Sequence, residues 1–244
     1  MKRICLFNYS LGRLQDSFMD FARRCSSIKC ADFFVLTADP AYEEWQQWLN
    51  EENFNNIFVV KLDLENFQQI MSDKIGEVYQ LSCPEKIGDW KCTYGHLFDA
   101  ISFRYEFWGY FDLDLAFGDL DKCLDGYATM DRYDIISASQ TGLCNFFTIY
   151  RDRYIYQTEK SWRFILTDDK IHDYIENQLD KAVKAAEENI CLGIGKFFHF
   201  DEIIMDGRGK DATWENGKLT CEETGKEIML CNAGEINVLP KGNG

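Results

Sequence analysis

Asp112 and Asp114 are the residues whose type and spacing point most directly to chemistry. They follow the apolar and aromatic part of segment 105–120, which is typical of a strand buried on both faces. Residues i and i+2 of an extended chain point to the same side, so we expect the two carboxylates to face the same way. Carboxylates that lose hydration together need a compensating cation or hydrogen-bond donors. A hard divalent metal with oxygen ligands is the simplest compensation.

The surrounding pattern predicts a mostly parallel sheet flanked by helices. Short apolar runs predict strands at 3–8, 31–37, 56–62, 105–120, 133–137 and 145–150. Helical spacing of apolar residues predicts helices at 11–28, around Trp45 to Leu49, at 64–81, at 90–102 and at 166–189. Strands that alternate with helices imply parallel strands joined by crossovers. Near the C-terminus, Asn216-Gly217 predicts a β-hairpin.

Functional groups of such sheets gather at the carboxyl ends of the strands. Besides the two aspartates, four polar residues lie at or just after the carboxyl ends of predicted strands: Asn8, Tyr9, Asp39 and Asp63. We therefore expect a site at this edge of the sheet.

The charge balance argues against nucleic acid as the main partner. The chain has 244 residues, with 41 acidic and 26 basic side chains and a formal net charge of −15. This charge opposes attraction to phosphate backbones and to anionic lipid, so at most a peripheral association with membranes is expected. A local basic site for a nucleotide phosphate is still compatible with this net negative charge.

The ten cysteines occur singly, and many lie in apolar segments. This pattern favours reduced, buried thiols over a disulfide framework, and no CxxC spacing with a nearby histidine predicts a zinc site. The apolar run after Met1 is too short for a signal peptide, and no segment reaches the length of a membrane span. We expect a cytoplasmic protein.

A resemblance to a known family rests on residues 86–120. The block KIGDWKCTYG at 86–95, then Phe98, then FWGYFDLDLAFGDL at 107–120 resembles a bacterial family of DxD glycosyltransferases associated with capsule and lipopolysaccharide biosynthesis. The resemblance is dense over residues 86–150 and weak elsewhere. It implies a GT-A-like fold, in which a nucleotide-binding parallel sheet ends in the DxD and an acceptor-binding region follows.

The resemblance also implies a mechanism. A nucleotide diphosphate-sugar would donate its sugar to a hydroxyl of a glycan or lipid-linked glycan, with Mn²⁺ or Mg²⁺ as cofactor. Asp114 would ligate the metal, and Asp112 would hold the ribose or share the metal. A metal fixed at the strand end stabilises the negative charge of the departing nucleoside diphosphate. Many GT-A enzymes take a third metal ligand from a late histidine, but here none follows His199, so Asn232, Glu235 or water would complete the shell.

Five further residues are candidates for donor binding or for positioning the groups that bind the donor. Lys91 is expected to reach a phosphate and Asp89 to orient Lys91 or a sugar hydroxyl, unless Asp89 caps a helix beside solvated lysines. Tyr9 next to Asn8 is placed to stack on the base, or is an ordinary loop tyrosine. Asp39 either bonds to the base or ribose, or forms the turn that Asp39-Pro40 indicates.

Asp201 and Glu202 form the second constellation. They follow the aromatic run Phe197-Phe-His-Phe200 and resemble the family's downstream Phe-Asp-Glu. A carboxylate flanked by aromatic residues is expected to have a raised pKa, which suits proton transfer from an acceptor hydroxyl. Asp201 is the first candidate for this catalytic base and Glu202 the second, unless the two residues begin a short helix.

These observations predict one main domain and a short extension. Residues 1–205 would form the GT-A-like domain, with the nucleotide-binding half at about 1–120 and the acceptor half at about 121–205, and residues 206–244 would form the hairpin and tail. Two other functions stay open: a nucleotide-sugar or glycan-binding module without catalysis, and a haloacid-dehalogenase-type phosphatase. The phosphatase is disfavoured because Leu115 follows the DxD and because the motif comes after three βα units.

Overall fold

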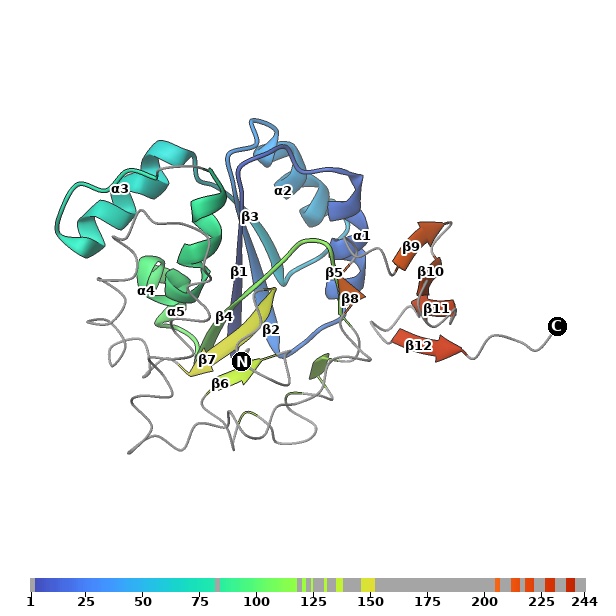
Figure 1. Cartoon of the computed structure of the whole chain (residues 1–244). Coiled ribbons are helices and arrows are strands. Elements are labelled where there is room, and N and C mark those ends of the chain that lie inside the picture. The colour runs from blue at the N-terminus through green and yellow to red at the C-terminus, as the bar shows by residue number, and fades with distance from the viewer. Residues whose placement is uncertain are drawn as a thin grey trace.

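A six-stranded sheet forms the centre of the protein in the computed structural model (Figure 1). The structure describes residues 3–81, 84–117, 120–121, 124, 130, 135–137, 146–151, 205–206, 212–215, 218–221, 227–230 and 236–239. The strands of the sheet lie in the order β3-β2-β1-β4-β7-β6. Their bounds are β1 (Ile4–Ser10), β2 (Ala31–Thr37), β3 (Ile57–Lys61), β4 (Phe107–Phe111), β6 (Ile135–Ser137) and β7 (Phe147–Arg151).

The predicted parallel core is confirmed. β1 pairs in parallel with β2 and β4, and β2 pairs in parallel with β3, whereas β7 runs antiparallel to β4 and to β6. The carboxyl ends of four parallel strands therefore meet at one edge of the sheet.

Helices cover both faces of this sheet (Figure 1). α1 (Asp16–Cys25) and α2 (Tyr42–Glu51) pack on one face. α3 (Leu64–Ile75), the 3₁₀ helix η1 (Pro84–Thr93), α4 (Tyr94–Leu97) and α5 (Asp99–Ser102) lie on the other side. Two predicted helices are shorter than expected. The first begins only at Asp16, and α3 ends at Ile75 because Gly76 adopts the left-handed conformation, with φ 83°.

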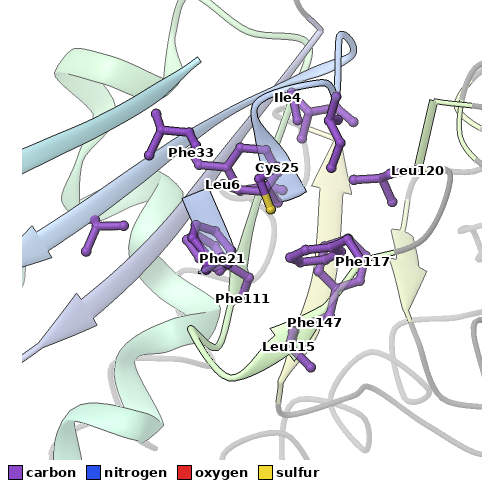
Figure 2. Close-up of a cluster of buried hydrophobic side chains, with 14 of the residues drawn as sticks. Ile4, Leu6, Phe21, Cys25, Phe33, Phe111, Leu115, Phe117, Leu120 and Phe147 are labelled. Atoms are coloured by element: carbon purple, nitrogen blue, oxygen red, sulfur yellow. The ribbon is translucent and has the colours of Figure 1, made fainter. Parts of the chain in front are cut away.

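Side chains along the central strands point alternately to the two faces of the sheet and fill a hydrophobic core on each face. Ile4 and Leu6 of β1 point into the core under α1 and α2, part of which Figure 2 shows, while Cys5 and Phe7 point into the other core. β4 behaves in the same way, and all five of its residues are buried. The predicted burial of this strand on both faces is confirmed.

Close packing brings η1 and α4 against β4. Trp108 is 1% exposed and stacks on Tyr150 with ring centroids 4.6 Å apart. A Cβ atom at Gly95 would lie 2.2 Å from a ring carbon of Trp108, so only glycine allows this approach. The predicted helix at 90–102 is divided into η1, α4 and α5, and Phe98, which lies between the last two, has the non-helical angles φ −109° and ψ 39°.

The C-terminal strands form two smaller sheets. β5 (Leu115–Ala116) pairs with β8 (Met205–Asp206). β9 (Ala212–Glu215), β10 (Lys218–Cys221), β11 (Glu227–Leu230) and β12 (Ile236–Leu239) form an antiparallel sheet in chain order. Glu215 lies opposite Lys218, so the strands around Asn216-Gly217 form the predicted hairpin, within a sheet that is larger than expected. The predicted helix at 166–189 lies outside the described residues.

Four cysteines, Cys5, Cys25, Cys30 and Cys92, are buried thiols, as expected. Among the described residues, no helix combines the length and apolar character needed to cross a membrane.

Candidate functional site

Asp112 lies in a turn at the carboxyl end of β4. The Leu115 N–H donates to the Asp112 carbonyl at 3.2 Å, and the Asp112 N–H donates to the Phe146 carbonyl at 3.1 Å. Our prediction of extended backbone from Asp112 to Asp114 is therefore wrong, because the chain reverses here to bury Leu115 in the core under α1. The strand alternation from which we expected the two carboxylates to face the same way therefore does not apply to Asp112 and Asp114.

The ammonium group of Lys91 provides a positive charge for Asp112. Lys91 Nζ lies 2.6 Å from Asp112 Oδ1, and the two side chains are 19% and 12% exposed. The residues are 21 positions apart in the chain and meet because η1 packs against the ends of β1 and β4. A cation at this edge of the sheet is suited to bind a phosphate group.

A second lysine–aspartate pair lies on η1 itself. Lys86 Nζ is 2.6 Å from Asp89 Oδ2, with side chains 5% and 13% exposed. We expected Asp89 to orient Lys91 or to stand beside solvated lysines, but its partner is Lys86, and Lys86 is buried. Trp90, 1% exposed and packed edge-on against Tyr79, anchors the same helix. η1 is therefore a fixed support for the Lys91 side chain.

Asn8 lies near the carboxyl end of β1, next to the end of β4. Its Nδ2 donates to the Phe111 carbonyl at 2.9 Å, which directs the amide toward the peptide that enters Asp112. Its Oδ1 is buried and accepts no hydrogen bond within the described part of the chain. A buried acceptor without a donor is costly, so this oxygen is suited to a donor group of a ligand.

Tyr9 points to the opposite face of the sheet from Asn8. Its ring stacks on Phe67, with centroids 4.5 Å apart and an interplanar angle of 12°. Burial, together with the nearby Asp63 carboxylate, raises the pKa of Tyr9 to about 12. Phe67 thus covers one face of the Tyr9 ring. Stacking of a nucleotide base on Tyr9 stays a prediction, and the base would have to use the opposite face of the ring.

The carboxylate of Asp39 accepts three hydrogen bonds from described residues of the chain. Oδ2 accepts from the Leu14 N–H at 2.8 Å and from Trp45 Nε1 at 3.2 Å, and Oδ1 accepts from the Ala41 N–H at 2.9 Å. Burial raises the pKa of this carboxyl, but the hydrogen bonds from Ala41 and Leu14 outweigh it and lower the pKa. The contacts favour the turn-forming alternative, and a role of Asp39 in donor binding stays a prediction.

Tyr94 is a residue of this site that our sequence reasoning did not single out. It is 1% exposed at the start of α4. Burial raises its pKa well above the ordinary value, and the charges of Asp112 and Tyr9 raise it further. A buried tyrosine next to a glycine has no local pattern that marks it as part of a site.

The carboxylate oxygens of Asp112 and Asp114 are the type of ligand that a hard divalent cation prefers. Both supply oxygen, and Mg²⁺ or Mn²⁺ is often held by one or two carboxylates together with substrate phosphates and water. Within the described residues, no group of three histidine, cysteine or acidic side chains is arranged to hold a metal. The fit is therefore to a metal held jointly with a phosphate ligand. Asp201 and Glu202 lie outside the described residues, as do Asn232 and Glu235.

Residues 6–229 match a family described as "Family of unknown function (DUF6625)". Among curated proteins, none matches the sequence.

Solved structures with a similar fold include the apo form of the glycosyltransferase GlyE from Streptococcus pneumoniae TIGR4. The TM-score is 0.51 at 10% sequence identity, over 88% of this chain and 57% of the GlyE chain. A second GlyE structure has a TM-score of 0.45 at 11% identity, with the same coverage. The apo form of mouse xyloside xylosyltransferase 1 has a TM-score of 0.49 at 10% identity, over 81% of this chain and 84% of that one. The chain spans a little more than half of the length of GlyE. The similarity to GlyE, together with the mostly parallel six-stranded sheet flanked by helices, confirms the predicted GT-A-like α/β fold.

Proposed function

The chain belongs to this family, DUF6625, and we propose that it is a glycosyltransferase that moves a sugar from a nucleotide diphosphate-sugar to a hydroxyl of a glycan. The observation that carries the proposal is the mostly buried Lys91–Asp112 pair at the carboxyl ends of β1 and β4. Ligands of open α/β sheets bind at this edge, and the fold is shared with GlyE.

The site residues have complementary roles in this proposal. Lys91 binds a phosphate of the donor, and the Asn8 amide oxygen, buried without a donor in the described structure, accepts a hydrogen bond from the nucleoside. Asp112 and Asp114 hold Mn²⁺ or Mg²⁺, which when bound neutralises the charge of the leaving diphosphate. Asp201, or alternatively Glu202, removes the proton of the acceptor hydroxyl.

The finer assignments belong to the same proposal. The glycan or lipid-linked glycan acceptor is part of a bacterial surface polysaccharide, as the resemblance of residues 86–120 implies. The transferred sugar is a hexose. The buried thiols of Cys5, Cys25, Cys30 and Cys92 support a cytoplasmic location, where thiols stay reduced.

A thermal-shift screen of nucleotide diphosphate-sugars, with and without Mn²⁺, tests the proposal. A donor at about 100 times its Kd stabilises the folded state by about 2.7 kcal/mol, which raises Tm by roughly 5 to 10 °C for a chain of this size. Asp114→Ala is expected to lose the Mn²⁺-dependent part of the rise. Glu106→Gln, at the opposite end of β4, is the matched control and keeps it.

Release of nucleoside diphosphate is the second measurement. The enzyme is expected to hydrolyse its donor slowly and to release nucleoside diphosphate faster when an acceptor glycan is added. Donor binding without transfer to any member of a broad acceptor panel would instead support the non-catalytic binding module. No Tm rise with any donor, together with Asp114→Ala behaving like the wild type, would overturn the proposal.

A further inference from the structure

The Lys91 ammonium occupies the carboxylate that the proposed function assigns to a divalent metal. Lys91 Nζ and Asp112 Oδ1 are 2.6 Å apart in a site where both side chains are mostly buried. A metal on the same carboxylate would bring two positive charges within a few ångströms of each other. Such a repulsion is poorly screened where water is scarce. The ammonium group and the metal therefore compete for Asp112.

We propose that Lys91 acts as a latch that keeps the metal site closed until a diphosphate arrives. In the ligand-free protein its ammonium is paired with Asp112. When donor and metal bind together, the ammonium moves to the diphosphate and releases Asp112 to the metal. This inference rests on the proposed function and adds an order of events to it.

The chemistry of lysine and the packing of η1 make this movement feasible. Lysine carries a compact charge on a flexible four-carbon stem, so its head can move while its backbone stays in place. Trp90 and the Lys86–Asp89 pair hold the backbone of η1. A buried ammonium also needs a negative partner in both states, and Asp112 and the diphosphate would supply it in turn.

The latch predicts that metal and nucleotide bind cooperatively. Metal alone has to displace Lys91 from Asp112, and within the described residues no group of three metal-ligating side chains is present to compensate. Each ligand must then strengthen the other by the same factor, since binding free energies are reciprocally linked. A lysine that only braces the site predicts the reverse, because its removal would leave Asp112 less ordered and the metal more weakly bound.

Binding of Mn²⁺ to the full chain, measured by electron paramagnetic resonance of the unbound ion without nucleotide, tests the latch. Lys91→Met is expected to bind Mn²⁺ at least about tenfold more tightly than the wild type, because a unit charge a few ångströms away is removed. Calorimetry with UDP, GDP, CDP or ADP in the presence of Mn²⁺ is expected to show at least tenfold weaker nucleotide binding to the same variant. Lys91→Gln removes the charge but keeps a hydrogen-bond donor, and it should reproduce both changes if Lys91→Met does not fold.

Two controls separate the latch from general effects of charge. Lys91→Arg keeps a cation opposite Asp112 and should stay within about threefold of the wild-type Mn²⁺ affinity. Lys74→Met breaks the partly exposed pair of Lys74 with Asp99 and removes one positive charge elsewhere, so it should leave Mn²⁺ binding unchanged.

An unchanged or weakened Mn²⁺ affinity in both Lys91→Met and Lys91→Gln overturns the latch, while a wild type that binds Mn²⁺ with nucleotide keeps the proposed function. If Mn²⁺ binds neither the wild type nor the variants, even with nucleotide, the latch and the metal-assisted part of the proposed function are both overturned. A donor that still raises Tm in that case leaves sugar transfer itself standing.

Discussion

The two ends of β4 both carry ion pairs, but they differ in burial and in the type of cation. At the amino end, the Glu106 carboxylate is 40% exposed and lies between Arg3, 2.9 Å away and 26% exposed, and Arg151, which is 18% exposed, so the two ends differ mainly in the burial of the carboxylate. Toward the carboxyl end, each of the two aspartates, Asp89 and Asp112, pairs with one lysine, and all four side chains are less than 20% exposed.

This difference indicates which end of β4 is suited to bind a ligand. Arg151 also packs over the Phe107 ring at 4.4 Å and donates to the Met130 carbonyl, so the arginines tie neighbouring segments together. Ion pairs whose carboxylate is exposed to solvent, as Glu106 is, contribute little to stability. Burying a lysine–aspartate pair costs desolvation that packing alone would avoid. Buried charges at the edge where parallel strands end are therefore better explained by ligand binding than by stability.

The largest expected effect on stability is at Lys86. Lys86→Met leaves Asp89 as a buried carboxylate without its cation, which is expected to cost about 3 kcal/mol or more. Chemical denaturation at pH 7 measures this cost. The protein interior accommodates the neutralised pair but not a single buried charge. Lys86→Met combined with Asp89→Leu should therefore recover most of the lost stability. A double variant as unstable as the single one would show that η1 needs the ion pair itself.

The ion pair of Lys86 with Asp89 is a contact that sequence spacing alone can indicate. In a 3₁₀ helix, residues three apart lie on the same side, so the spacing from 86 to 89 would have indicated this pair if η1 had been recognised as 3₁₀. We expected a helix at 90–102 and expected Asp89 to orient Lys91 or a sugar hydroxyl, or to cap that helix. The close approach of Gly95 to Trp108, which packs α4 against β4, joins residues of two different elements, so the local pattern of that segment does not reveal it.

Burial patterns were the most predictable part of the fold. β2 has the predicted bounds, Ala31–Thr37, and β4 is buried on both faces, because a continuous apolar run fits a central parallel strand. The same apolar continuity concealed the turn at Asp112, where the Asp112 N–H also donates to the Phe146 carbonyl, 34 residues later in the chain. The contact between Lys91 and Asp112 is likewise tertiary, so the local sequence around neither residue indicates its partner.

The next largest expected effect is on transfer, at Asp112. Asp112→Asn preserves shape but removes the charge that pairs with Lys91, and it weakens the proposed metal site. We expect transfer to fall by about 100-fold or more, as for loss of one preorganised electrostatic group. Steady-state kinetics with the donor found by thermal shift measures it, with denaturation as a check that the variant is folded. A variant with near wild-type kcat/KM would remove Asp112 from the site.

The smallest expected effect is at the amino end of β4, where Glu106→Gln tests the other half of the comparison. The hydrogen bond from Arg3 is the main cause that lowers the pKa of Glu106 below its ordinary value of 4.5, burial opposes it, and Arg151 adds to the lowering. A lowered folded pKa contributes stability above the ordinary pKa, and this contribution is lost as pH falls through the folded value.

The stability difference between wild type and Glu106→Gln should therefore be greatest near pH 7 and should disappear at pH values below the folded pKa. Its size is expected to be less than about 1 kcal/mol, because Glu106 is substantially exposed to solvent. Denaturation at a series of pH values, in low and high salt, measures it, and donor binding should be unchanged throughout. A loss comparable to that of Lys86→Met would show that both ends of β4 depend equally on their ion pairs, and burial would then no longer distinguish the candidate site.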